Sequence, residues 1–575
     1  MYLRRLYRPR PFYQYNTLAP RPRDTSPLIL PFPACILLCA YVALEPLTSV
    51  HVAGSERDLP NEKKPPSKPV SLAPQPSSYD WTVLLASALT AASMLYLALR
   101  IPTGIPGEWG NPYHNIFPGA GQVILFGFVM LLFLAAAFLF DWLSRRVKVA
   151  ARSLLVALLT AGYGGVLFAC VICGPMGRAE LAVPAFEWNA CGLFRHEAAR
   201  IADPGDYLKH FPETLAKYGA DYKATIRVNN NPPGTTMLFY GAFRLSEHAP
   251  WLSDFATGLV FGTDFKPPTP TYAATVLGAW FLLIGAALAF VPAYLVASHF
   301  RAAGSFFPAA VAMLAISLLL FTPDNDTLQV TFFLWMLYFC LKSRDGHAAL
   351  WGAALGLAAS VAFFFTLATA VVVVILMSYS AIEVSLSRAG LRQRLLFWAA
   401  SGLGLLIGFF ALYAATGYNS FSSLLACYKN HEAFYLYYPR TYWKWLLYNP
   451  VEFLLFTGGP LFAAVLASLW RRPPSPAAGA SSRAQAAWCL IAAAFAVLVL
   501  LDISGKNSSE INRLWVFFMP LMTLPACVLL TAFPGGLRRL LMIGLLQIMI
   551  VLATRTYIDV WRIEEFFRDI SKYLE

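Results

Sequence analysis

The chain alternates long apolar runs with short polar connections over most of its length. Runs of about 20 apolar residues, enough to cross the roughly 30 Å hydrocarbon layer as a helix, recur from residue 81 onward. These runs are continuous rather than alternating in polarity, so they predict an all-α polytopic membrane protein and exclude the short strands of a β-barrel. The predicted spans are 81–100, 122–143, 153–173, 271–297, 304–322, 327–341, 348–361 with 363–384, 395–416, 451–470, 486–503, 513–532 and 538–554.

One polar interruption, residues 174–270, is much longer than the others. Within it, Asp203-Pro204-Gly205-Asp206 predicts a turn, and the residues after the turn repeat apolar side chains at helical spacing. We expect this helical stretch to lie flat on the membrane with its apolar side down. A membrane protein that keeps so long a segment between two spans usually does its chemistry there.

Composition and charge fix the orientation of the spans. The chain is 58% hydrophobic and 13% charged with a mean hydropathy of +0.56, which excludes an ordinary soluble domain. The net charge of +13 comes largely from basic residues between spans, at 144–148, 342–344, 388–394, 471–472 and 538–539, and the positive-inside rule makes these loops cytoplasmic. The apolar spans predict a lipid bilayer as partner, and the charge balance reflects their orientation and gives no reason to invoke nucleic acid.

The other set of loops carries acidic residues and is predicted to face outward. These acids are Glu187, Asp203, Asp206, Asp221, Asp324, Asp326, Asp502 and Glu510. Two patterns, basic loops on one side and acidic loops on the other, thus agree on one topology.

Residues 1–79 form a basic, Pro-rich N-terminal extension with one short apolar stretch at 28–47. If this stretch spanned the membrane once, the most basic segment of the chain would face outward, against the topology above. An interfacial or re-entrant stretch, an uncleaved leader and a spurious upstream start each avoid that conflict, and the sequence does not choose among them. Residues 51–79 have the composition of a disordered linker.

The nine cysteines are scattered singly, and most fall within or at the ends of apolar spans, as buried small hydrophobic residues do. Cys170 and Cys173 have CxxC spacing, but no second pair or histidine cluster completes a zinc site, and we predict no metal ligands. Cys191 and Cys427 lie in predicted outer loops, where they could pair.

The order of these parts resembles the GT-C superfamily of integral-membrane glycosyltransferases. In that superfamily a membrane helix leads into a large first outer loop with an acid just past the helix, here 153–173 and Glu187. The run Asn231-Pro232-Pro233-Gly234 looks like the His-Pro-Pro-Gly element of many bacterial members. The segment from Gly505 to Trp515 is similar to a charged element that opens a late helix in the same proteins.

The resemblance covers residues 153–555 and implies a GT-C-like multi-span bundle that includes the outer loop 174–270. An N-terminal transmembrane hairpin at 80–152 would precede it, and a tail at 556–575 would follow. Asn230 or Asn231 stands where histidine is common, and no Asp-Asp or Asp-Glu pair follows the leading helix. The identity of the catalytic base and any divalent metal requirement therefore stay open.

The implied reaction moves a sugar from a polyprenyl-phosphate carrier to an acceptor glycan, lipid or protein on the extracytoplasmic side of a membrane, and a bacterial inner membrane is expected. One outer-loop carboxylate suffices as general base, and Glu187, Asp206 and Asp203 are the candidates. The carrier phosphate needs fixed positive charge, for which arginine is well suited. The candidate donor-binding residues are Asn230, Asn231, Lys506, Glu510, Arg513, Arg440 and Lys444.

Each candidate also has an ordinary structural role open to it. Asp203 and Asp206 suit a turn and a helix cap, Asp324 suits the cap of the span 327–341, and Glu510 and Arg513 have the spacing of a helical ion pair. The aromatic residues around Arg440 and Lys444 suit a headgroup-level belt as well as sugar stacking.

The alternative to an enzyme is a transporter or flippase of a lipid-linked or anionic substrate. Such a protein should contain inverted repeats and broken helices near the midplane. No clear repeat is present, and the acids lie at the outer ends of spans. A non-catalytic scaffold would leave the long loop without a purpose. No phosphate-binding glycine loop or His-Glu-x-x-His motif is present, so the residues for soluble-nucleotide or zinc-protease chemistry are missing.

Overall fold

Helices make up nearly all of the structure, which is a computed structural model. It describes residues 79–114, 117–147, 149–218, 227–301, 304–387, 390–470, 481–533 and 535–561. The predictions for the N-terminal extension before residue 79, for Asp221 and for the last residues of the tail lie outside these ranges. The predicted class, an all-α polytopic membrane protein, is confirmed: nine helices among the described residues are long and apolar enough to cross a membrane.

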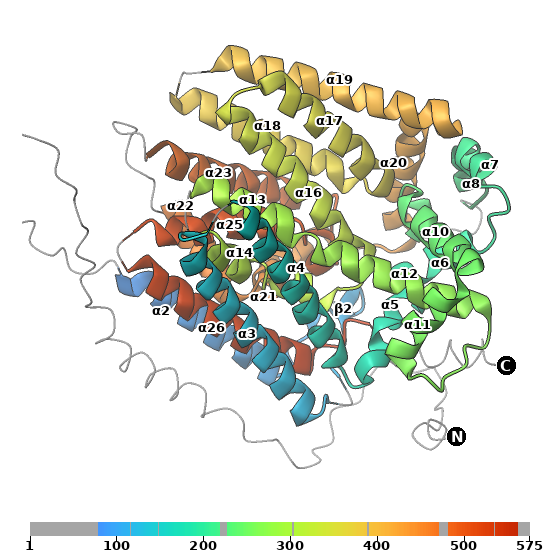
Figure 1. The fold of residues 1–575 in the computed structure, drawn as a ribbon, viewed down its shortest axis with the longest axis horizontal. Coiled ribbons are helices and arrows are strands. Elements are labelled where there is room, and N and C mark those ends of the chain that lie inside the picture. Colours follow the sequence, from blue (N-terminus) through green and yellow to red (C-terminus); the bar gives the residue numbers. More distant parts are fainter. Residues whose placement is uncertain are drawn as a thin grey trace, which may run out of the picture. The chain divides into compact units, whose positions relative to one another are not determined.

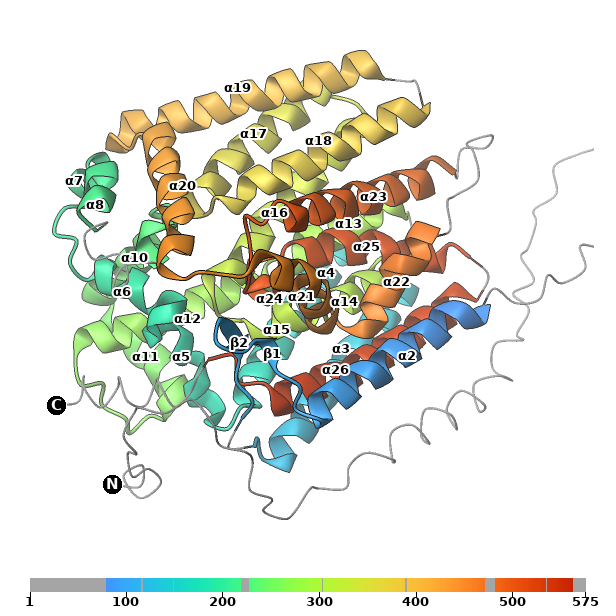
Figure 2. The same cartoon turned by 180° about the vertical axis from the view of Figure 1, so that it is seen from behind.

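These nine helices form a bundle in which neighbours run side by side (Figures 1 and 2). They are α2 (Tyr79–Ala98), α3 (Ala120–Ser144), α4 (Val149–Ile172), α12 with α13 (Pro270–Ala287 and Phe290–Phe300), α17 (Ala348–Phe365), α18 (Ala368–Ser387), α19 (Leu391–Thr416), α23 (Ser481–Ile503) and α26 (Gly536–Tyr557).

Four further predicted spans, 304–322, 327–341, 451–470 and 513–532, are not among these nine helices. The prediction of one span over 304–322 is wrong, because this segment forms two short buried helices, α14 (Phe306–Ala312) and α15 (Ile316–Leu320). Pro323 lies just beyond α15, where it cannot continue the helix. Likewise 513–532 divides into α24 (Ile511–Leu514) and α25 (Phe518–Thr531), too short to cross the hydrocarbon layer. The predicted span 327–341 forms one mostly buried helix, α16 (Asn325–Lys342), which is not among the nine, and the short turn η6 (Ser343–Asp345) follows it.

The predicted span 451–470 is sharply broken. Two helices, α21 (Tyr442–Thr457) and α22 (Gly459–Trp470), meet at an angle of 109°. Gly458 between them has a φ of +95°, which residues with a side chain rarely adopt, so the break is built into the sequence. The preceding polar segment is helical, as α20 (Ser420–Tyr437).

The outer loop folds into short helices that gather at one end of the bundle (Figure 1, right side). They are η3 (Gly177–Leu181), α5 (Val183–Phe186), η4 (Trp188–Gly192), α6 (Leu193–Ala198), α7 (Pro204–Lys209), α8 (Phe211–Tyr218), α10 (Gly234–His248) and α11 (Pro250–Phe261).

The predicted helical stretch of this loop, α7 and α8, is present. Its apolar residues Leu208, Phe211 and Leu215 are buried against Tyr418 and Cys427. The expectation that this side faces lipid is therefore wrong, because Tyr418, just before α20, and Cys427 of α20 supply the apolar partners instead. Cys191 and Cys427 are both free thiols, so they form no disulfide.

A small β-hairpin between α2 and α3 was not predicted. Its strands β1 (Thr103–Ile105) and β2 (Trp109–Asn111) pair antiparallel, with Gly104 opposite Gly110. Beyond α26, Ile558 bridges Tyr113, so the start of the predicted tail joins the fold beside this hairpin.

The hairpin is fixed to α21 through Glu108 in its turn. The Glu108 carboxylate accepts hydrogen bonds from the Thr441 N–H at 2.9 Å, the Thr441 hydroxyl at 2.6 Å and Trp445 Nε1 at 2.7 Å, and Lys444 Nζ lies at 3.4 Å. Partial burial would raise the pKa of Glu108, but these hydrogen bonds outweigh it and lower the pKa to about 2. Glu108 is therefore ionised at neutral pH and holds the hairpin in place.

Candidate active site

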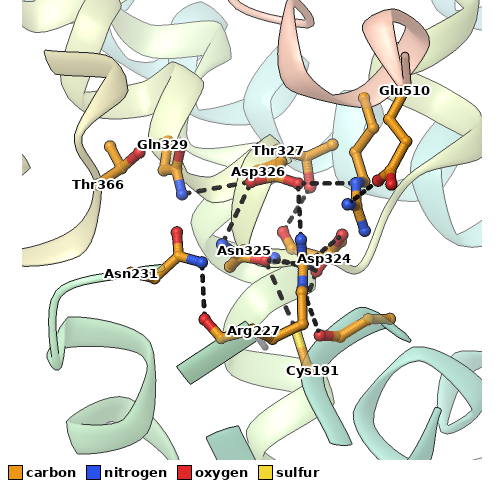
Figure 3. Close-up of polar contacts among 12 residues, drawn as sticks. Cys191, Arg227, Asn231, Asp324, Asn325, Asp326, Thr327, Gln329, Thr366 and Glu510 are labelled. Atoms are coloured by element: carbon orange, nitrogen blue, oxygen red, sulfur yellow. Dashed lines mark hydrogen bonds and ion pairs between the residues drawn. The ribbon is translucent and has the colours of Figure 1, made fainter. Parts of the chain in front are cut away.

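A buried polar cluster surrounds the first turn of α16. Asp324 is the N-cap residue, and its carboxylate accepts the Asn325 N–H at 2.8 Å. The predicted capping role of Asp324 is thus present, yet its side chain is also fully buried among other polar groups. Figure 3 shows Asp324, Asn325 and Asp326 at the centre of this cluster. A helix N-terminus favours carboxylates, so this acidic turn is electrostatically consistent with its position.

Arg227 joins the outer loop to this turn. Its Nη2 lies 2.9 Å from Asn325 Oδ1 and 3.4 Å from both carboxylate oxygens of Asp324. Its Nε donates to the carbonyl of Ala190 at 3.0 Å, and its Nη1 lies 3.8 Å from Asp326 Oδ2. One buried guanidinium thereby links two parts of the outer loop with the start of α16.

Arg513 approaches the same turn from the late charged segment. Its Nε lies 3.4 Å from Asp326 Oδ2, and its Nη2 forms a close ion pair with Glu510. The predicted pairing of Glu510 with Arg513 is therefore present, and Asp326 is a second partner. Gln329 donates to the other Asp326 oxygen at 3.4 Å, so in Figure 3 Asp326 stands between Gln329 and Glu510.

The backbone that presents Glu510 is strained. Ser509 and Glu510 have φ values of +127° and +57°, a region that residues with side chains rarely adopt. Consecutive residues of this kind each cost roughly 1–3 kcal/mol and cluster at functional sites. Glu452 of α21 is buried beneath this segment, with its carboxylate facing the backbone N–H groups of Ile511 and Asn512.

Glu187 is presented by a tight turn after α5. It is 5% exposed, and its carbonyl accepts the N–H groups of Ala190 and Gly192 at 3.0 and 2.9 Å. A side chain on Gly192 would meet the carbonyl oxygen of Phe186 at 2.4 Å, so only glycine allows this turn. Cys191, which directly precedes Gly192 in this turn, donates from its thiol to Asp324 Oδ1 at 3.0 Å. Burial and the nearby Asp324 charge raise the pKa of this thiol well above its usual range, which keeps it a donor.

One cavity collects residues from five parts of the chain. It holds about 450 Å³ of empty space, including its open mouth. The predicted residues Glu187, Glu510 and Arg513 all line it. The other lining residues are Trp109, Asn111, Ala190, Phe321, Asn512, Val560 and Trp561. Residues more than 300 positions apart in the sequence thus share one concave surface.

The Asn-Pro-Pro-Gly turn lies on the other side of the cluster. Asn231 Nδ2 donates to the carbonyl of Arg227 at 2.8 Å, and Asn430 Nδ2 of α20 lies 3.3 Å from the carbonyl of Asn229. Asn230 is half-buried in the same turn. A side chain on Gly234 would meet the carbonyl oxygen of Phe364 at 2.6 Å, so this turn packs directly on the end of α17. Neither Asn230 nor Asn231 lines the cavity of Glu187.

Asp203 and Asp206 lie apart from the cavity, on α7. Asp203 caps that helix and accepts the Gly205 N–H at 2.8 Å. Asp206 pairs with His210 at 3.0 Å, and its side chain is 71% exposed. These contacts are the turn and cap roles that the sequence offered as the alternative to catalysis.

The four predicted cations differ in their partners. Arg513 is ion-paired with Asp326 and Glu510, Lys506 pairs with Glu432 at 2.9 Å on the surface, and Lys444 lies beside Glu108. Arg440 instead donates from Nε to the Ser509 hydroxyl at 3.1 Å. In the part of the chain that the structure describes, Arg440 makes no ion pair with a carboxylate.

Arg227, Asn111 and Asn512 were not identified as site residues from the sequence. Arg227 carried a usable signal, because a cation in an outward loop opposes the usual charge bias. The hairpin of Asn111 also carried one, since Pro106-Gly107 is a turn pair between short segments. Asn512 gave no separate signal within the charged segment.

Among the described residues, no three His, Cys, Asp or Glu side chains are grouped so as to hold a metal ion.

Comparison with known proteins gave one structural match. No protein-family model matches the chain, and no curated protein matches it. The crystal structure of ArnT from Cupriavidus metallidurans bound to undecaprenyl phosphate is similar over 67% of this chain, with 15% identity and a TM-score of 0.36. The chain covers 62% of the ArnT chain, less than two thirds of it. A TM-score this low assigns no function to this chain.

Proposed function

We propose that this protein is a membrane glycosyltransferase that moves a sugar from a polyprenyl-phosphate carrier to an acceptor glycan, lipid or protein. The observation that carries the proposal is the shared cavity, where Glu187 of the first outer loop meets Glu510 and Arg513 of the late charged segment. These two segments, together with the Asn-Pro-Pro-Gly run outside the cavity, carry the GT-C resemblance. Transfer then takes place at the extracytoplasmic face of a bacterial inner membrane, the side to which the charge pattern assigns both loops.

Glu187 is the proposed general base. The acceptor hydroxyl attacks the anomeric carbon of the sugar, the bond from that carbon to the phosphate oxygen breaks, and the polyprenyl phosphate leaves with the electron pair. The hydroxyl proton passes to the Glu187 carboxylate. Glu187 suits this role better than Asp203 or Asp206 because it is buried and lines the cavity, whereas those two carboxylates make exposed local contacts.

Arg440 is the proposed contact for the carrier phosphate. Two guanidinium groups, of Arg227 and Arg513, are already matched by the carboxylates of Asp324, Asp326 and Glu510. An additional phosphate there would have to displace a carboxylate. Within the described residues Arg440 forms no ion pair: its Nε donates to the Ser509 hydroxyl, its Nη1 lies 3.5 Å from the Pro439 carbonyl oxygen, and its guanidinium lies over the Phe434 ring. Because Ser509 is next to the cavity residue Glu510, the planar fork of Arg440 can meet phosphate oxygens at the cavity rim.

A transporter or flippase is the second candidate, because of one specific feature. The break between α21 and α22 resembles the discontinuous helices that bind substrates in transporters, and the buried Glu452 lies on α21 close to that break. In this alternative the polar cluster would bind the substrate without reacting with it.

A transfer assay in detergent separates the two candidates, since no membrane then divides two compartments. Purified protein is mixed with polyprenyl-phosphate donors carrying labelled sugar and with membrane extract as the acceptor source. The proposal expects label in the acceptor with wild type and loss of transfer in Glu187→Gln. Folded protein that binds the labelled lipid but transfers nothing to any acceptor fraction would instead favour the transporter.

A further inference from the structure

The cavity is lined by uncharged as well as charged side chains. Asn111 of β2 and Asn512 of α24 contribute amides to its lining, and Trp109 and Trp561 contribute aromatic rings. Glu187 and Glu510 line the same cavity. We call Asn111, Asn512, Trp109 and Trp561 the amide wall.

Two donors of the amide wall are buried without a partner. Within the described ranges, Nδ2 of Asn111 and Nδ2 of Asn512 have no hydrogen-bond acceptor, and neither atom is exposed to solvent. The Asn512 side chain as a whole is only 2% exposed. A buried donor without an acceptor costs roughly 1–3 kcal/mol, so both amides favour a bound group, either water or a ligand, that supplies an acceptor oxygen.

The charges of the cavity select the kind of ligand. The carboxylates of Glu187 and Glu510 accept hydrogen bonds, the amides of Asn111 and Asn512 donate them, and the one lining guanidinium is ion-paired with Glu510. A phosphate offers only acceptor oxygens and would be repelled by the two carboxylates. A sugar hydroxyl both donates and accepts, and the apolar face of a sugar ring suits aromatic side chains.

We infer that the amide wall is the subsite that recognises the glycosyl group, with Asn111 and Asn512 determining which sugar is accepted. This inference rests on the proposed function, because it places the transferred sugar between the amide wall and Glu187. The hairpin and the residues after α26 would then determine sugar specificity, while Glu187 performs the chemistry.

Backbone and side-chain hydrogen bonds hold the amide wall in place, as discrimination between similar sugars requires. Asn111 is the last residue of β2, its carbonyl accepts the Thr103 hydroxyl at 2.5 Å, and Glu108 fixes the same hairpin to α21. Asp559 donates its N–H to the carbonyl of Pro112 at 2.9 Å, which ties the Trp561 segment to the hairpin. A preorganised donor rejects a sugar that lacks the matching hydroxyl more strongly than a mobile one would.

A binding experiment tests the inference without requiring transfer. The thermal unfolding of full-length protein in detergent is measured with a panel of methyl glycosides and, separately, with inorganic phosphate. At least one glycoside should raise the unfolding temperature of wild type, and Asn512→Ala and Asn111→Ala should each weaken that glycoside's affinity roughly 10- to 100-fold. Asn419→Ala, which alters the N-cap of α20 away from the cavity, is the matched control and should leave the affinity unchanged.

The outcomes are distinguishable from those of the transfer assay. Glycoside binding that Asn512→Ala leaves intact, or stabilisation by phosphate but by no glycoside, overturns the sugar subsite. Glycoside binding that depends on Asn512, in a protein that transfers no sugar, retains the subsite and overturns the glycosyltransferase. If the protein is active, both asparagine variants should also change the ratio of kcat/KM between two donor sugars, a ratio that a general loss of folded protein does not move.

Discussion

Two acidic sites of the same outer loop have very different surroundings. Glu187 is 5% exposed and lines a cavity with Glu510 and Arg513, whereas Asp206 has a side chain 71% exposed and pairs with a residue one helical turn away. The sequence offers Glu187 and Asp206 as candidates for the same role of general base, since both are acids in one polar loop. Whether an acid of this loop lines the cavity depends on its packing against a segment that is distant in the sequence, and residue type does not reveal that packing.

The largest expected effect is on catalysis. Glu187→Gln should lower kcat by roughly 10²–10⁴-fold and leave the affinity for the carrier nearly unchanged, because a general base acts on the proton and not on the lipid. Asp203→Asn and Asp206→Asn should change kcat by less than a few-fold. Steady-state transfer kinetics measure all three. An inactive Asp206→Asn beside an active Glu187→Gln would reverse the comparison and move the base to α7.

The second effect is on stability. Arg227→Met leaves Asp324 buried beside Asp326 without its cation, and should destabilise the fold by roughly 3–5 kcal/mol. Arg244→Met is the matched control: its ion pair with Glu247 is on the surface, so the loss of stability should be much smaller than for Arg227→Met. Detergent unfolding curves give both values. Equal losses for the two variants would mean that the buried cluster is not held together by Arg227.

The third effect concerns the donor phosphate. Arg440→Ala should raise KM for the polyprenyl-phosphate donor by roughly 10- to 100-fold, and Arg440→Lys should recover only part of the affinity because lysine lacks the planar fork. Lys506→Ala, which removes a surface ion pair, should change KM little. If Lys506→Ala weakened the donor more than Arg440→Ala does, the phosphate would belong at the surface lysine.

The smallest effect is a pH dependence of the hairpin. The pKa of Glu108 is about 2 in the folded protein, below its usual value, so its stabilising contribution is complete above the unfolded-state pKa near 4.3. That contribution should be lost as the pH falls from about 4.3 towards 2. Glu108→Gln should therefore unfold a few degrees lower than wild type at pH 7, with the gap closing in acid. A gap that stayed constant down to pH 2 would show that the carboxylate charge is not what holds the hairpin.

Much of the fold follows from local sequence. The nine long apolar helices can be predicted because a 20-residue apolar run has few alternatives in a bilayer. The capping roles of Asp203 and Asp324 also follow, since a cap needs only residues next to it in the chain. Short buried segments are less predictable: 304–322 is apolar enough for a span, but it divides into α14 and α15 because neighbouring helices bury it on all sides.

The site could be predicted only in part, because it is made of long-range contacts. Glu187, Glu510 and Arg513 could be named from their loops, but no local pattern reveals that Arg227 reaches Asp324 or that Asn111 and Trp561 close the same cavity. The apolar side of α7 and α8 shows the same limit. Its spacing predicts an amphipathic helix equally well on lipid or on protein, and Tyr418 of a distant segment decides the outcome.

The most direct test of the central claim is an experimental structure with a bound donor analogue that cannot be cleaved. The claim is that sugar transfer occurs in the cavity shared by Glu187, Glu510 and Arg513. We expect density for the sugar in that cavity, with its anomeric carbon facing the Glu187 side, its hydroxyls within hydrogen-bond distance of Asn512, and the phosphate beside Arg440. Density for the sugar along α7, next to Asp203 and Asp206, with the cavity empty, would contradict the claim.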